Sequence, residues 1–104
     1  MNIEFTARHF HVPDSVKDYA IEEVSKLKKY NSRAIKCQVI LMHENNQFTT
    51  ELNLSIPRKK LNVKDTTDNL TKSIDRAVKK MIQRISRLKT KRELSIEPKS
   101  DQYS

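Results

Sequence analysis

Residues 67–92 read TDNLTKSIDRAVKKMIQRISRLKTKR, and this stretch decides which fold the chain can form. Its apolar residues recur at spacings of three and four, which predicts one long amphipathic helix. The apolar positions are Leu70, Ile74, Ala77, Val78, Met81, Ile85 and Leu88. The opposite face carries Lys72, Arg76, Lys79, Lys80, Arg84 and Arg87. We expect the apolar stripe to pack on a sheet and the polar side chains of residues 65–68 to cap the first turn.

The residues before this helix predict three strands, preceded by a strand and a helix. Alternation in residues 3–8 indicates a first strand, and apolar spacing over residues 13–30 indicates a helix that begins at a proline. Two strands over residues 35–42 and 48–56 are joined at an Asn-Asn turn, and Leu61 and Val63 mark a short fourth strand. The order β-α-β-β-β-α predicts an α+β fold, a two-layer sandwich whose four-stranded mixed sheet carries both helices on one face. We expect one domain over residues 1–92 and a flexible C-terminal tail over residues 93–104.

The net charge of +8 is concentrated in one third of the chain. Residues 1–56 hold seven basic and seven acidic side chains, residues 57–92 hold thirteen and three, and residues 93–104 hold one and three. A basic surface of this kind attracts polyanions by releasing their counterions, so nucleic acid is the first partner to consider and an acidic membrane surface the second. Two or three cations would be enough to complement the helix dipole, and the basic residues from Lys72 to Arg92 exceed that need.

Several functional classes find no support in these residues. The chain has no glycine, which removes a P-loop, a dinucleotide fingerprint and a Gly-rich KH-type loop. His9, His11 and His43 have no carboxylate or thiol at ligand spacing, and the acids of the first helix are better explained as partners of Lys17 and Lys26. We therefore predict no enzymatic activity, no metal, no cofactor and no small-molecule substrate.

The predicted location is the cytoplasm. No apolar run is long enough to span a bilayer, and the N-terminal residues lack the basic then apolar pattern of a signal peptide. The single cysteine, Cys37, also fits a reducing compartment, and its place in an alternating apolar run predicts a core position. Recognition of a base sequence is weakly supported, because the long helix has no companion helix to place it in a major groove and the central strands lack the aromatic residues of RNA-binding sheets. We expect recognition of shape and charge.

Local motifs and their order resemble the ribosome hibernation-promoting factor family, also called ribosome-associated inhibitor A or sigma-54 modulation proteins. The motifs are the Ile3-Glu4-Phe5-Thr6 opening, the helix start over residues 12–17, the helix end Lys26-Leu27-Lys28-Lys29-Tyr30, and Ile74-Asp75 in the last helix. The resemblance covers about residues 1–92 and is to the short form, without a separate C-terminal domain.

This resemblance implies a partner and a mode of action. Members of the family occupy the groove of the small ribosomal subunit where messenger RNA and the anticodon arms of transfer RNA meet, and so silence and protect idle ribosomes. The residues of this chain at the family's ribosomal RNA contacts are Lys79, Lys80, Arg84, Arg87 and Lys91, with Lys28, Lys29 and Arg8 as additions. The resemblance implies no membrane partner, and it leaves open whether a helper factor pairs ribosomes. Two alternatives remain: a general module for structured RNA and a protein adaptor that modulates a sigma factor.

Overall fold

The computed structural model describes the backbone of residues 1–96 and the side chains of residues 1–88. Its order of elements is β-α-β-β-β-α, as the sequence predicts. The elements are β1 (Asn2–Arg8), α1 (Asp14–Ser25) with a 3₁₀ turn (Lys26–Lys29), β2 (Lys36–Glu44), β3 (Gln47–Ile56), β4 (Lys59–Thr67) and α2 (Leu70–Ile96). No helix among these residues is long and apolar enough to cross a membrane.

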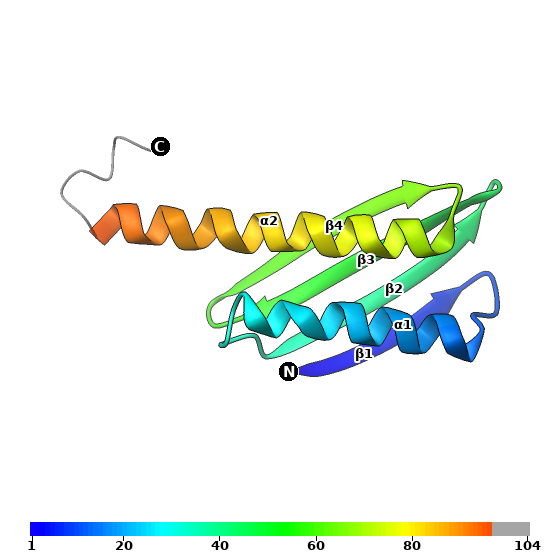
Figure 1. Cartoon of the computed structure of the whole chain (residues 1–104), viewed down its shortest axis with the longest axis horizontal. Helices are drawn as coiled ribbons and strands as arrows, with labels where there is room; N and C mark the ends of the chain where they lie inside the picture. The colour runs from blue at the N-terminus through cyan, green and yellow to red at the C-terminus, as the bar shows by residue number, and fades with distance from the viewer. Residues whose placement is uncertain (97–104) are drawn as a thin grey trace.

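The four strands form one mixed sheet in the order β1-β2-β3-β4. β1 runs parallel to β2, because α1 carries the chain back between them, and the other neighbours are antiparallel hairpins. Both helices cover the same face of this sheet, with α2 packed on β3 and β4 and α1 beside it (Figure 1). The predicted two-layer sandwich is therefore confirmed, and no helix of residues 1–96 covers the other face of the sheet.

Alternation along the strands places the core between the sheet and the helices. Cys37, Val39 and Leu41 of β2 are fully buried, and they belong to the same core cluster as Ile74 and Met81 of the apolar stripe of α2, which are also fully buried. Cys37 thus has the predicted core position, and burial raises the pKa of its thiol to about 12. The thiol is consequently protonated and shielded at neutral pH.

The two tight hairpins form without glycine. Asn45 and Asn46 have φ angles of 53° and 61°, which confirms the predicted Asn-Asn turn between β2 and β3. Between β3 and β4 the turn is Pro57-Arg58, and Arg58 has a φ of 67°. Asparagine tolerates this left-handed region better than arginine, so the second turn is the more strained of the two.

Three element boundaries differ from the prediction. The last turn of the first helix is a 3₁₀ turn, and β4 is a full strand that reaches Thr67, so residues 65–67 do not cap α2. Asn69 takes that role, because its Oδ1 accepts a hydrogen bond from the backbone N–H of Lys72 at 2.9 Å. α2 continues beyond Arg92 to Ile96, while residues 97–104 of the predicted tail lie outside the described residues. The C-terminal part of α2 extends past the end of the sheet (Figure 1).

Candidate nucleic-acid interface

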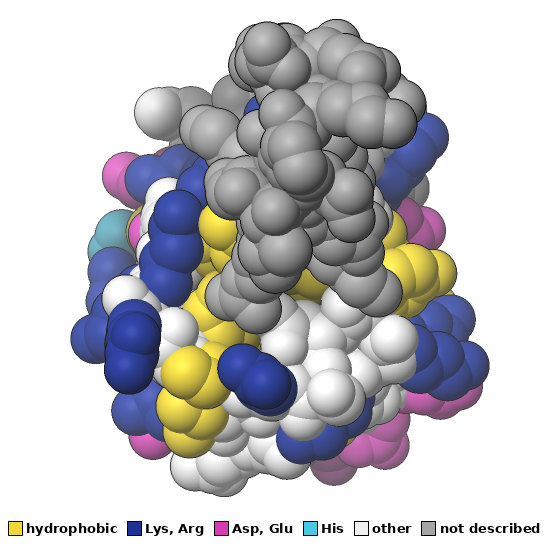
Figure 2. Space-filling model, turned by 90° about the vertical axis from the view of Figure 1, so that its left-hand side faces the viewer, with side chains coloured by type: hydrophobic (Ala, Val, Ile, Leu, Met, Phe, Trp, Pro, Cys, Tyr) yellow, Lys and Arg dark blue, Asp and Glu magenta, His cyan; other side chains and the backbone are white. Residues whose placement is uncertain are grey.

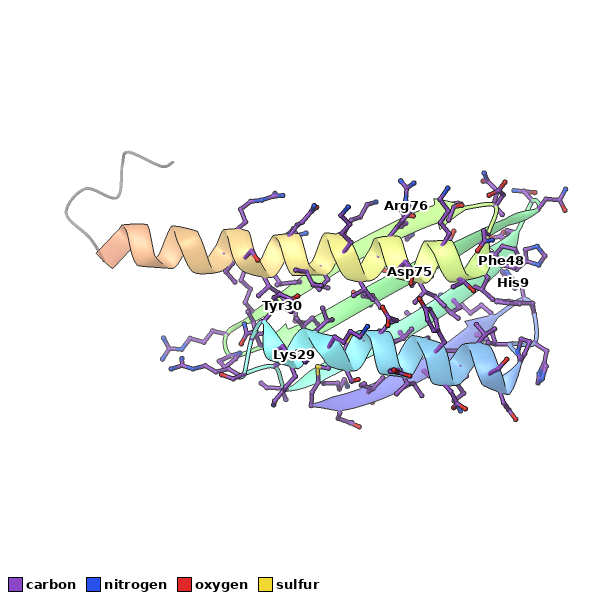
Figure 3. All side chains as sticks on the ribbon, viewed as in Figure 1. His9, Lys29, Tyr30, Phe48, Asp75 and Arg76 are labelled. Carbon is purple, nitrogen blue, oxygen red and sulfur yellow. The ribbon has the colours of Figure 1, made fainter. Side chains whose placement is uncertain are left out.

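The outer face of α2 is the candidate site, and burial of the opposite face sets its orientation. Ile74, Met81 and Ile85 are buried against the sheet, so side chains half a turn away from them face solvent. The basic residues on this outer face are Lys72, Arg76, Lys79, Lys80, Arg84 and Arg87. In Figure 3, Arg76 points away from α1, whereas Asp75 points toward it. The structure thus gathers the predicted basic face of the long helix on one side.

Asp75 is the single acid on α2 within the described side chains, and it does not neutralise this face. Its carboxylate accepts a hydrogen bond from the hydroxyl of Tyr19 on α1. That hydrogen bond, with partial burial, raises the pKa of Tyr19 to about 12. The pair links the two helices and directs the acid into the space between them, away from the basic face.

A second acid, Asp65 of β4, forms ion pairs with two cations of the basic face. Its carboxylate, only 3% exposed, lies 2.8 Å from Lys80 Nζ and 3.0 Å from Arg76 Nε, and these two cations are 46% and 54% exposed. Lys80 Nζ is the cation next to Oδ1 of this carboxylate, and Arg76 is the cation next to Oδ2. The buried Oδ2 accepts no hydrogen bond, so Arg76 contributes its positive charge alone. Asp65 therefore anchors the two cations to β4 instead of capping α2, the role predicted from the sequence.

The edge of the sheet also binds the helix cations. β4 is an edge strand, and edge strands present backbone groups that no neighbouring strand pairs. Lys80 Nζ donates a hydrogen bond to the carbonyl of Lys64 at 2.9 Å, and Arg84 donates one to the carbonyl of Asn62 at 3.0 Å. A groove of about 260 Å³ runs beside these contacts.

The basic face therefore contains two sets of cations. We call Arg76, Lys80 and Arg84 the anchored cations, because each contacts β4. We call Lys72, Lys79 and Arg87 the open cations, because each is exposed and none forms an ion pair with a carboxylate of residues 1–88. A phosphate approaching the open cations has no internal carboxylate to displace. The sequence does not separate these sets, because the separation depends on which residues lie on β4.

The additional predicted contacts lie in three different places. Lys29 is exposed at the end of the 3₁₀ turn and lines a pocket together with Ile85 and Leu88 of α2. Lys28 instead donates a hydrogen bond to the carbonyl of Ala34 at 3.3 Å, and its charge lowers the pKa of the N-terminal ammonium. Arg8 follows the alternation of β1 on the uncovered face of the sheet, so the structure does not bring it together with the others. The Lys91 side chain lies outside the described residues.

Figure 2 views the end of the molecule where α2 extends past the sheet. Lys and Arg side chains occupy more than one side of this end, with hydrophobic and neutral side chains between them. Arg33 is exposed in the loop after the 3₁₀ turn and lines the same pocket as Ile85 and Leu88 of α2. Its position in a loop next to α2 is a tertiary feature, which the order of residues along the chain does not show.

Other chemistry finds little support in the part of the chain with described side chains. His43 stacks on Phe48 with ring centroids 4.2 Å apart, and Phe10 packs edge-on against both. No group of three metal-ligating side chains gathers anywhere in that part. On α1, Lys26 pairs with Glu23 at 2.6 Å as predicted, whereas Lys17 forms no ion pair within the described side chains and its Nζ lies 5.6 Å from the centre of the Phe5 ring.

The sequence matches the family model described as "Sigma 54 modulation protein / S30EA ribosomal protein" over residues 3–93. A curated relative, "Ribosome-associated factor Y" of Haemophilus influenzae, is 23% identical over 93 residues, which are 89% of this chain and 87% of the relative. Another, "Ribosome hibernation promoting factor" of Acidithiobacillus ferridurans, is 34% identical over 70 residues, which are 66% of this chain and 74% of the relative.

Two solved structures share the fold. The Protein Y N-terminal domain of Thermus thermophilus superposes with a TM-score of 0.76 at 23% identity, over 85% of this chain and 99% of that one. A ribosomal subunit interface protein from Coxiella burnetii superposes with a TM-score of 0.80 at 15% identity, over 86% and 98%. At these identities the likeness concerns the fold alone.

Proposed function

Because the chain belongs to the Sigma 54 modulation protein / S30EA ribosomal protein family, we propose that it is a ribosome-associated hibernation factor that binds RNA of the small subunit through the outer face of α2. The names of its curated relatives support the association with ribosomes. The observation that carries the RNA contact is the open row of Lys72, Lys79 and Arg87, which faces solvent on a rigid helix. Cations held on a helix neutralise phosphates without the loss of conformational entropy that ordering a loop would require.

In this proposal the bound protein blocks translation by occupying space. The helix layer occupies the groove in which messenger RNA and the anticodon arms of transfer RNA meet, so the bound protein excludes both RNAs. The protein needs no catalytic group for this action, and a cytoplasmic location follows from the location of ribosomes. Lys29 in the 3₁₀ turn and Lys91 in the last part of α2 complete the proposed contacts. Lys80 and Arg84 add positive potential from their anchored positions.

The proposal is tested with two triple variants of equal charge. One replaces the open cations Lys72, Lys79 and Arg87 by Ala. The matched control replaces Arg8, Lys36 and Lys60, which lie on the uncovered face of the sheet. Fluorescence anisotropy of labelled protein, titrated with purified small subunits at several salt concentrations, gives the affinity and its salt dependence.

We expect the open-cation variant to weaken binding and to reduce the slope of log affinity against log salt by about 2 to 3, since each phosphate contact contributes roughly 0.7 to 0.9. The control should keep the slope of the wild type. Equal losses in both variants would show that overall charge, and not this face, governs binding. Full binding by the open-cation variant would reject the site.

Competition distinguishes the alternatives. Bulk duplex RNA that displaces the protein from small subunits at equal phosphate concentration would indicate a general module for structured RNA. An interaction that survives nuclease treatment of the ribosomal RNA would indicate a protein adaptor. Exclusion of messenger and transfer RNA is measured directly, by asking whether prebound protein lowers the fraction of small subunits that retain a labelled transfer RNA on a short message.

A further inference from the structure

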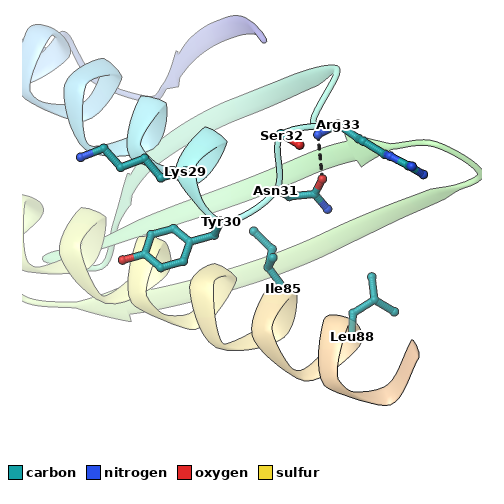
Figure 4. A pocket seen from close by; sticks show the side chains of 7 residues that line it. All are labelled: Lys29, Tyr30, Asn31, Ser32, Arg33, Ile85 and Leu88. Atoms are coloured by element: carbon teal, nitrogen blue, oxygen red, sulfur yellow. Dashed lines mark hydrogen bonds between the residues drawn. The ribbon is translucent and has the colours of Figure 1, made fainter. Parts of the chain in front are cut away.

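A pocket lies where α2 continues past the end of α1 (Figure 4). Its volume is about 300 Å³, and it is open to solvent on one side. The 3₁₀ turn ends at Lys29, and residues 30–33 then leave the helix layer for the sheet, so α1 offers no side chains to cover this part of α2. Leu88, which is partly exposed, and Ile85, which is only 2% exposed, line the pocket from α2.

The pocket is also lined by a residue with an exposed aromatic ring. Tyr30 is 45% exposed, and only one other large hydrophobic side chain of the described residues, Ile35, is comparably exposed. In Figure 4 the ring extends from the end of the 3₁₀ turn toward the side of Lys29, and Tyr30 lines the pocket together with Ile85 and Leu88. An exposed planar ring at the edge of a partly apolar pocket suits a flat, partly apolar group, because stacking removes both surfaces from water.

The polar groups around the pocket favour an anion with hydrogen-bonding edges. Lys29 and Arg33 extend on opposite sides of it, and none of its lining residues is acidic. Asn31 Oδ1 accepts a hydrogen bond from the backbone N–H of Arg33 at 2.9 Å, which fixes the amide in place and leaves its Nδ2 donors for another acceptor. A nucleotide within an RNA strand has this combination: a flat base, polar base edges and a phosphate on either side.

We propose that this pocket binds one unpaired nucleotide extruded from an RNA helix or loop. The base stacks on the exposed ring of Tyr30 at the edge of the pocket, and the phosphates on its two sides meet Lys29 and Arg33. This inference deepens the proposed function and rests on it, because the pocket lies beside α2, the helix that carries the proposed RNA-binding face. It adds contact with a single base to a surface that otherwise recognises shape and charge.

The first test asks whether the pocket takes a base at all, independently of ribosomes. Adenosine monophosphate and inorganic phosphate are titrated separately, at equal ionic strength, into methyl-labelled protein, and the methyl signals of Ile85 and Leu88 are followed by NMR. We expect the nucleotide to shift these signals and phosphate to leave them unchanged. Equal responses to both probes, or none, would overturn base binding at this pocket.

The second test measures the contribution of Tyr30. The probes are a hairpin RNA with a one-nucleotide bulge and the same hairpin with an abasic bulge, and the proteins are the wild type, Tyr30→Ala, Tyr30→Phe and Ile35→Ala. Stacking of a base on an aromatic side chain typically contributes enough that its loss weakens binding by about tenfold or more. Tyr30→Ala should show that loss on the bulged hairpin and little change on the abasic one.

Tyr30→Phe keeps the ring and should bind as the wild type does, and Ile35→Ala controls for removal of exposed apolar surface outside the pocket. Thermal unfolding shows that each variant is folded. If Tyr30→Ala binds the bulged hairpin as tightly as the wild type, the pocket assignment fails, while binding of small subunits through the open cations would still stand. If the wild type does not bind small subunits at all, the proposed function fails instead.

Discussion

Replacing Asp65 by Asn tests whether this buried acid anchors the helix cations. The variant keeps the size of the side chain and removes its charge, so Lys80 and Arg76 lose the carboxylate that lies 2.8 and 3.0 Å from them. An exposed ion pair contributes at most about 1 kcal/mol, and breaking a fully buried one costs roughly 3 to 5 kcal/mol. Asp65 is buried while its partners are about half exposed and can be rehydrated, so we expect a loss of about 2 kcal/mol in the free energy of unfolding.

Thermal and urea unfolding measure this loss. For a domain of about 100 residues, 2 kcal/mol corresponds to a decrease in Tm of about 8 to 16 °C. The control is Glu4→Gln, which removes an exposed pair with Lys36 at 3.3 Å and should change stability by less than about 1 kcal/mol. A loss for Asp65→Asn no larger than that of the control would refute the anchoring role.

The same variant tests the division between anchored and open cations. Asp65→Asn raises the net charge by one and leaves the open cations in place, so binding to small subunits at a temperature where the protein is folded should be unchanged or tighter. Weaker binding by the folded variant would mean that the positions of Lys80 and Arg76 matter to the RNA, and the division would be wrong.

Three further predictions concern the turn, the thiol and the link between the helices. Asn46→Val should lower the free energy of unfolding by at least about 1 kcal/mol, because a β-branched residue is poorly accommodated at a φ of 61°, whereas Asn46→Gly should not; urea unfolding compares the two. Cys37 should resist a thiol reagent at pH 8 in the folded protein and react at once in denaturant, because burial raises its pKa to about 12; fast labelling under native conditions would contradict the buried position. Tyr19 should ionise near pH 12, as followed by ultraviolet absorbance, and Asp75→Asn should move its pKa toward the usual value of 10. Since the folded-state pKa is the higher one, the stability from this hydrogen bond is present below pH 10 and is lost as the pH rises toward 12.

The elements were predictable because their signals are local. Spacings of three and four marked the buried stripe of α2, strict alternation marked β2 and β3, and Asn45-Asn46 marked the hairpin between them. The ends of elements were harder to predict. Leu61 and Val63 indicate the fourth strand, but its end was predicted too early. Asp65 continues the alternation of buried residues in β4, yet an acid followed by two threonines is also typical of a helix cap.

The sequence by itself determined that this chain forms one long basic helix on a small mixed sheet, because periodicity and charge are properties of neighbouring residues. Only the tertiary structure decided which cations are open. Asp65, Asn62 and Lys64 of β4 contact cations of α2 because the helix folds back onto this strand, and the contacting residues are up to 22 positions apart in sequence. The tertiary structure also placed Arg8 on the uncovered face and brought Tyr30 and Arg33 beside Ile85 and Leu88. Contacts of this kind depend on the packing of distant elements, and no short-range pattern encodes them.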